Sequence, residues 1–377
     1  MVHWLPPHQE HLLYTLAHVD AVLDRVSSVI FEYVTGDVFG FANEVRDGVD
    51  HLTLASIAPI PEAVPRLTAD AINQMRSAIE HALFAEVEFQ MGRPLNSDEA
   101  QMVEMPAKRD NDNLLLWMRH KRRRTLTVLH EDSVLGKRIA LLQPYHQVDQ
   151  ETHPLRILIE HSNFSKHRMP AVAAARVGQV IPEQKADGFT SRPAYEDDEV
   201  VAVGDVLSSV PLGNPVRVSI WPQLTVRRPH TGSWEVIIHE LRELEEWTRT
   251  VAIPVIILGT TQCTPIHPYL DISVGHDSFE TSMARAKPES AVERAMVRIK
   301  AKSLRDDLPG VFQEQLPDIP YETVMAFLSH QDDAEVVGLF ERYRRVRSNR
   351  GLQSAIIYLR RKVGESMSPN WTGAQRK

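Results

Sequence analysis

One short stretch of the chain combines side chains that could act together on a phosphodiester. Asn73, Arg76 and Glu80 are three and four residues apart, so on a helix they share one face. Ser77 and His81 are four apart and lie on the adjacent face. Arginine stays charged and can stabilise a phosphorane, histidine exchanges protons near neutral pH, and a hydroxyl can orient either one. This spacing predicts a catalytic group of Arg76, Ser77 and His81.

A helix must carry these residues. Prolines at 59, 61 and 65 interrupt the chain before it, which favours a helix start at Thr68 as N-cap, with Asp70 in the first turn. We expect this helix to end near Phe89. An apolar stripe along it would face a core, and its members are Ile72, Met75, Ile79 and Leu83.

The elements before this helix are also indicated by pattern. Residues 11–34 repeat apolar side chains every three or four positions, which predicts a long amphipathic helix. Two strand-like runs follow, Val38–Val45 and Val49–Ile57. They meet at Asp47-Gly48, a dipeptide typical of a tight hairpin turn because it tolerates positive φ angles.

The rest of the chain suggests three regions. With a further helix from Pro154 to Lys166, residues 1–175 form a mainly α domain, a helical bundle with a small β-hairpin. Residues 176–260 form a small α+β region of short strands and one helix. Its loop spans Ile181–Glu199, its strands Val200–Val203, Val206–Val210 and Val216–Val226, and its helix begins at Ser233. Residues 261–377 form a helical C-terminal region.

The segment from residue 76 to 81, Arg-Ser-Ala-Ile-Glu-His, resembles the Arg-polar-x-x-x-His signature of the HEPN superfamily of helical domains. The wider layout is similar to actinobacterial and phage proteins of unassigned function. Those proteins carry a comparable helix, a Leu-Gln-Pro-Tyr segment and an Asn-Ile-Asp-Lys-His-Arg segment. The counterparts here are Leu142–Tyr145 and Asn163–Arg168, and the resemblance covers about residues 8–250. This chain has Ser165 where that pattern has Asp, which removes a charge partner beside Lys166.

The resemblance implies a function in RNA cleavage. Many HEPN domains are metal-independent RNases of defence or stress systems, phage defence included, in which two protomers bring their Arg and His together across a homodimer interface. Arg76 would then be the transition-state cation, His81 the proton-transfer group and Ser77 an orienting hydroxyl. The residues that would line the same RNA-binding groove are Asn73, Tyr145, Asn163, Lys166, His167 and Arg168.

The charge distribution allows a local nucleic-acid surface. The formal net charge of −8 argues against a coat of nucleic acid over the whole protein. Two clusters are nevertheless basic, Arg119–Arg124 and Arg342–Lys362. From the first we take Arg122, Arg123 and Arg124 as RNA-binding candidates, although a solvated helix face explains either cluster equally well.

A structural interpretation of the same residues stays open. Arg76 and Glu80 form a common i, i+4 ion pair, and His81 can bridge helices inside a bundle. The cations of Asn163–Arg168 suit a helix C-terminus, where the dipole favours positive charge. The alternative function is therefore a non-catalytic dimeric scaffold that binds nucleic acid or a protein partner.

Other classes of function find little support in the sequence. Cys263, His267, Asp271 and His276 lack the paired spacing of zinc sites, so we predict no metal and no other cofactor. No phosphate-binding glycine loop or nucleophile elbow is visible. The start of the chain lacks a signal-peptide pattern, no apolar run is long enough for a membrane, and the single cysteine favours a reducing compartment. We expect a cytoplasmic protein.

Overall fold

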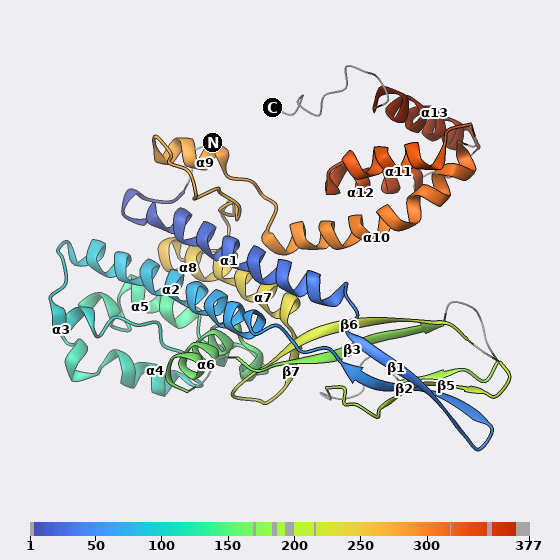
Figure 1. Cartoon of the computed structure of the whole chain (residues 1–377). Helices are drawn as coiled ribbons and strands as arrows, with labels where there is room; N and C mark the ends of the chain where they lie inside the picture. The colour runs from blue at the N-terminus through green and yellow to red at the C-terminus, as the bar shows by residue number, and fades with distance from the viewer. Residues whose placement is uncertain are drawn as a thin grey trace. The chain divides into compact units, whose positions relative to one another are not determined.

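Helices make up most of the chain, and two small antiparallel sheets accompany them (Figure 1). This confirms the predicted mainly helical content. The chain divides into two compact units, residues 1–292 and 293–377, each with its own hydrophobic core. The computed structural model describes residues 4–168, 171–182, 187–192, 200–214, 216–316, 318–344 and 349–366.

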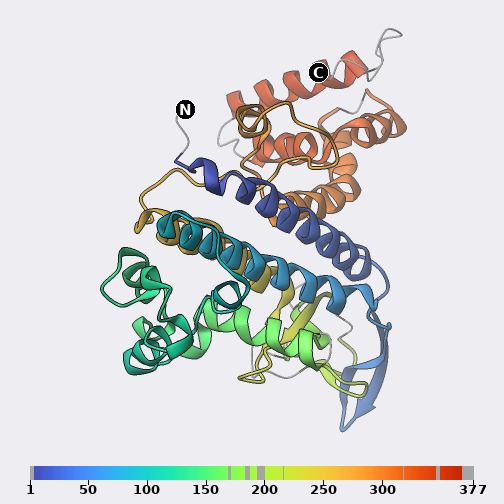
Figure 2. The same ribbon diagram turned by 90° about the vertical axis from the view of Figure 1, so that its left-hand side faces the viewer.

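Two long helices, α1 (His11–Val34) and α2 (Ala63–Met91), lie side by side at the centre of the first unit (Figure 2). They are antiparallel, because His8 and Gln9 just before α1 contact Glu86 near the end of α2. The helix predicted over 11–34 is confirmed. Both predicted apolar stripes are buried between the helices and the rest of the core.

The start of α2 differs from the prediction. The helix begins at Ala63, and Thr68 is a buried residue of its second turn whose hydroxyl donates to the carbonyl of Val64 at 2.8 Å. Pro65 does not prevent this start, because the N–H groups of a helix's first turn have no intrahelical partner to lose. The helix ends at Met91, where Gly92 takes a left-handed φ of 67°.

Helices from later in the chain complete the bundle around α2. They are α6 (Pro154–His167), α7 (Ile237–Trp247) and α8 (Ile253–Leu258), the last two joined by the π-helical turn η6 (Thr248–Ala252). The boundaries predicted at 175 and 260 therefore do not separate compact units. Apolar side chains on α7 and α8 are buried in the same core as those of α1 and α2.

Shorter elements occupy the remaining helical part of the first unit. The α-helices are α3 (Ser97–Ala100), α4 (Asn111–Met118), α5 (Val134–Leu141) and α9 (Phe279–Arg285). The 3-10 helices are η1 (Pro7–Gln9), η2 (Lys121–Arg123), η3 (Thr127–Leu129), η4 (Pro144–His146) and η5 (Gln150–Thr152).

The predicted hairpin forms the edge of the first sheet. Its turn residues have the positive φ angles expected, 50° at Asp47 and 74° at Gly48. The sequence did not predict which later strand pairs with this hairpin. It is β5, from the middle of the chain, which pairs with β2. The order β1-β2-β5-β4 comprises β1 (Phe39–Arg46), β2 (Val49–Ile57), β5 (Val206–Pro211) and β4 (Thr190–Ser191).

The second sheet has the order β3-β6-β7, with β3 (Ala173–Pro182), β6 (Val218–Arg227) and β7 (Trp234–Val236). Strand β3 was not predicted. Val200–Val203, predicted as a strand, leads instead into a turn at Gly204, and Ser233 precedes β7 rather than capping a helix. Most of the loop predicted at 181–199 lies outside the described residues.

The second unit is helical, as predicted for the C-terminal region. Its core is separate from that of the first unit and is centred on Phe312, Leu316, Val324 and Phe327. Residues 261–290, predicted to belong with it, lie in the first unit. Its helices are α10 (Ala291–Gln315), α11 (Tyr321–His330), α12 (Asp333–Arg344) and α13 (Asn349–Ser366). Within the described ranges, no helix is both long enough and apolar enough to cross a bilayer.

Candidate functional site

Arg76 points from α2 toward α6. Its Nη1 donates to Oδ1 of Asn163 at 2.8 Å, and its Nε lies 3.5 Å from Oε1 of Glu80. Only 18% of the side chain is exposed. The packing of α6 on α2 thus brings Arg76 together with the Asn163–Arg168 segment. The two were predicted from the sequence as separate features.

The same face of α2 continues through Asn73. Its side-chain amide donates to the hydroxyl of Ser165 at 3.2 Å, and Ser77 donates to the Asn73 carbonyl at 2.9 Å. The contact between Asn73 and Ser165 joins two neutral side chains of α2 and α6. Ser77 is turned to its own helix rather than to Arg76 or His81.

Glu80 ties this network to the loop before α4. Its Oε2 accepts a hydrogen bond from the backbone N–H of Met105 at 2.8 Å. Burial raises the pKa of the Glu80 carboxyl, while the Met105 hydrogen bond and the charge of Arg76 act in the opposite direction. The predicted Arg76–Glu80 pair therefore exists, but in a partly buried setting rather than on an open helix face.

His81 lies on a different side of α2. It is exposed, and its ring centroid is 6.3 Å from that of His11 at the start of α1, with the planes tilted by 58°. Five residues of α-helix separate Arg76 and His81 by about 140° around the axis. One therefore meets α6 while the other meets α1, and the two do not share a site within one chain.

Two further histidines, His8 and His11, lie at or just before the start of α1, and His11 is the one beside His81. Burial, followed by the charge of His81, lowers the pKa of His11; a hydrogen bond to the backbone of His8 raises it, and the charge of His8 has a smaller lowering effect. His8 itself bonds Oε1 of Glu86 at 2.7 Å and stacks on Phe89 at 3.9 Å between ring centroids. Neither residue was predicted from the sequence, although His8 and His11 are three residues apart at the start of an amphipathic pattern.

The end of α6 presents cations to solvent. Lys166, His167 and Arg168 are all exposed, and the Arg168 guanidinium lies 5.7 Å from the centre of the Phe164 ring. Beside them is a cavity of about 290 Å³ between α6 and the turn from β6 to β7. It is lined by Ala69, His161, Phe164, Ser165, Ala171, Val172, Arg227, Arg228, Pro229 and Gly232.

The polar side chains that line this cavity differ in how accessible they are to a ligand. His161 is buried, and its Nε2 has no hydrogen-bond partner in the described part of the chain. Burial lowers its pKa to about 3, so it is neutral at pH 7. Arg228 is held by both carboxylate oxygens of Glu240, at 2.8 and 2.6 Å. Arg227 is exposed and donates through Nε to the Gly232 carbonyl at 3.2 Å. Arg227 is therefore the cation here most accessible to an anionic ligand.

The Arg119–Arg124 cluster is not a uniform basic surface. Arg123, proposed above as an RNA contact, is 6% exposed; its guanidinium lies 4.1 Å from the Trp117 ring centre and 3.0 Å from Glu104. Its role is structural, because a side chain in this position cannot reach a phosphate outside. Arg122 and Arg124 are exposed.

Tyr145 also lies apart from the α6 cavity, whose lining does not include it. It sits on η4, partly buried, with its hydroxyl 3.5 Å from Oδ1 of Asn111. Burial raises the pKa of its phenol. The structure therefore gives Tyr145 a contact with α4 instead of with Asn163–Arg168.

The ligand-type residues after α8 make local contacts. His267 bonds the Ala286 carbonyl at 3.0 Å, and His276 bonds the Asp271 carbonyl at 2.8 Å. In the part of the chain that the structure describes, no three His, Cys, Asp or Glu side chains are grouped as a metal site.

Comparison with known proteins finds no relative of this chain. No family model, no curated protein and no solved structure matches the chain.

Proposed function

We propose that the protein is a HEPN-like RNase that cleaves RNA without a metal ion, with His81 and His11 as its proton-transfer pair. The observation that carries the proposal is the pair of exposed imidazoles, 6.3 Å apart between ring centroids, on adjacent helices. At that separation both rings can approach oxygens of one phosphodiester. Transfer of protons to and from reacting oxygens is the task for which histidine suits neutral pH.

The roles follow from the environment of each ring. Burial and the charge of His81 lower the pKa of His11, which favours its neutral form, so we assign His11 as the base. It takes the proton of the 2′-hydroxyl, whose oxygen bonds to phosphorus. The bond from phosphorus to the 5′-oxygen then breaks, and that oxygen receives a proton from protonated His81. The products are a 2′,3′-cyclic phosphate and a free 5′-hydroxyl, which balances the step without a co-reactant.

A cation for the transition state must come from elsewhere, because Arg76 of the same chain faces α6. We assign this role to Arg76 of a second copy, as the two-protomer arrangement of the family implies. The exposed side chains of Lys166, His167 and Arg168 offer a surface for the RNA backbone. These residues lie at the end of α6, close in sequence to Asn163, the residue that holds Arg76.

The test is RNA cleavage in the presence of a chelator. We expect the wild-type protein to release fragments ending in 2′,3′-cyclic phosphate, with a bell-shaped dependence of rate on pH. His81→Ala and His11→Ala should each lower the rate by about 100-fold or more. His18→Ala, an exposed histidine further along α1, is the matched control and should leave the rate unchanged. Intact RNA, or equal cleavage by His81→Ala, would overturn the proposal.

A second candidate function is non-catalytic binding of nucleic acid. The observation that favours it is the pairing of Arg76 with Asn163 and Glu80, which gives that arginine a structural task. In that case binding would weaken steeply with salt and survive His81→Ala. It would be lost when Lys166 and Arg168 are replaced by glutamine.

A further inference from the structure

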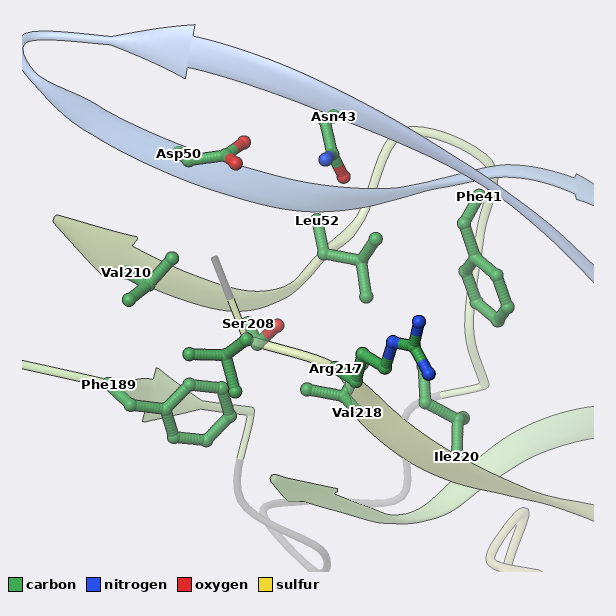
Figure 3. A pocket seen from close by; sticks show the side chains of 11 residues that line it. Phe41, Asn43, Asp50, Leu52, Phe189, Ser208, Val210, Arg217, Val218 and Ile220 are labelled. Carbon is green, nitrogen blue, oxygen red and sulfur yellow. The ribbon is translucent and has the colours of Figure 1, made fainter. Parts of the chain in front are cut away.

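A second cavity, of about 480 Å³, lies between the two sheets of the first unit (Figure 3). It is larger than the cavity beside α6 and falls within the range of small-molecule sites, about 300–1,000 Å³. Its walls are Phe41, Asn43, Asp50, Leu52, Phe189, Ser208, Val210, Val216, Arg217, Val218 and Ile220.

Strand register explains which side chains face it. Asn43 pairs with Leu52, and Leu52 pairs with Ser208, so these three side chains share one face of the first sheet. Asp50 and its partner Val210 are two residues along on the same face. The opposite wall comes from β6 and the residues just before it. Short side chains such as Ser208 leave space where two packed sheets ordinarily interdigitate.

Two charged side chains interrupt the apolar walls. The guanidinium of Arg217 reaches into the cavity near Phe41 and Ile220, while Asp50 lies on the other side of Leu52 (Figure 3). Oδ1 of Asp50 is buried and has no hydrogen-bond partner among the residues that the structure describes. Arg217 is exposed, and within the described ranges no salt bridge joins it to a carboxylate. Asp50 is half-buried and lines the cavity, so its carboxylate can accept a hydrogen bond from a ligand that carries a donor.

We propose that this cavity binds a short apolar peptide with free ends. The C-terminal carboxylate lies against Arg217, whose planar fork matches a carboxylate, and the N-terminal ammonium lies against Asp50. Apolar side chains of the peptide cover Leu52, Phe189 and Val218. Arg217 is exposed and Asp50 is half-buried, so a ligand with a carboxylate and an ammonium can pair with both, whereas a neutral apolar ligand pairs with neither and a simple anion only with Arg217.

The test uses the dipeptide leucyl-phenylalanine in calorimetric titrations of the full chain. We expect saturable binding, weakened by about tenfold or more when the peptide is C-terminally amidated or N-terminally acetylated. The affinities of all three peptides are measured on the wild-type protein. The result therefore does not depend on whether a variant folds. Absence of binding, or equal affinity for all three, would overturn the proposal.

Two variants then assign the ends of the peptide. Arg217→Gln should remove the preference over the amidated form only, and Asp50→Asn the preference over the acetylated form only. Arg46→Gln is the matched control, since Arg46 lies at the end of β1 and does not line the cavity. An Arg217→Gln variant that still prefers the free carboxylate would contradict the assignment.

Discussion

The interior of the first unit holds two histidines that resist protonation. Burial lowers the pKa of His161 to about 3, with smaller effects from the charges of His230 and Arg228. Burial also lowers the pKa of His153 to about 4. Nδ1 of His153 accepts the backbone N–H of Leu155 and so caps α6, a bond that a protonated Nδ1 could not accept. Both residues stabilise the fold only while they are neutral.

This predicts a loss of stability in acid. In the unfolded chain a histidine binds a proton below pH 6.5, whereas these two stay neutral in the folded chain until about pH 4 and 3. The unfolded state therefore gains protons first, and each residue lowers the free energy of unfolding by up to about 1.4 kcal/mol per pH unit across that window. Urea denaturation between pH 7.5 and 4.5 measures this slope.

Substitution of one buried histidine tests its contribution. His161→Gln should make the slope shallower by about one proton, provided that the variant folds at pH 7.5. His18→Gln, at an exposed position of α1, should leave the slope as it is in the wild type. A wild-type stability that is flat from pH 7 to 5 would contradict the neutral state assigned to His153 and His161.

At the scale of elements, the β1–β2 hairpin forms locally and then pairs with β5, a strand far away in the sequence. Its turn holds Gly48 at a φ of 74°, with open space where a side chain would be. Its second strand pairs with β5, more than 150 residues later, and so forms one wall of the cavity between the sheets. We therefore expect a change at the turn to alter the cavity wall that β2 forms with β5.

Gly48→Ala should destabilise the first unit by about 1 kcal/mol, because an alanine at a left-handed φ is strained even where there is room for it. Thermal unfolding followed by circular dichroism measures the loss. Asp47→Asn is the control and should have little effect, since asparagine tolerates the φ of 50° found there. If Gly48→Ala unfolded like the wild type, this turn would not limit the hairpin.

At the scale of the whole molecule, Arg76 and His81 point to different sides of α2, and this determines how many chains a site with both residues needs. One chain directs Arg76 to α6 and His81 to α1, so a site with both requires two chains. Proteins that carry Arg76→Ala or His81→Ala should each be inactive. If the proposed dimer forms, mixing the two variants and allowing chain exchange should give half of the dimers one complete site.

We expect such a mixture to recover about a quarter of the wild-type rate, which requires a symmetric dimer with exchangeable chains. RNA cleavage before and after mixing measures the recovery, with analytical ultracentrifugation as the check on dimer formation. A mixture of Arg76→Ala with itself is the control. An inactive mixture, or a protein that sediments as a monomer, would remove Arg76 from the proposed reaction.

The sequence by itself determined the elements whose signals are local. The helix over residues 11–34, the hairpin turn at Asp47-Gly48 and the buried stripe of α2 each depend on neighbours a few residues away, so spacing and turn chemistry predicted them. The start of α2 was missed because a proline near a helix start was taken as a break. Strand β3 was missed because it is paired along its length with β6, a partner far away in the sequence.

Only the tertiary structure decided which side chains meet. Asn163 holds Arg76, His11 stands beside His81, Trp117 covers Arg123, and Asp50 faces a cavity shared with Arg217. Each of these arrangements depends on the packing of one element against another, and no periodicity within a single element records it. The α2 helix was therefore predictable, while the direction of each side chain on it was set by α1 and α6.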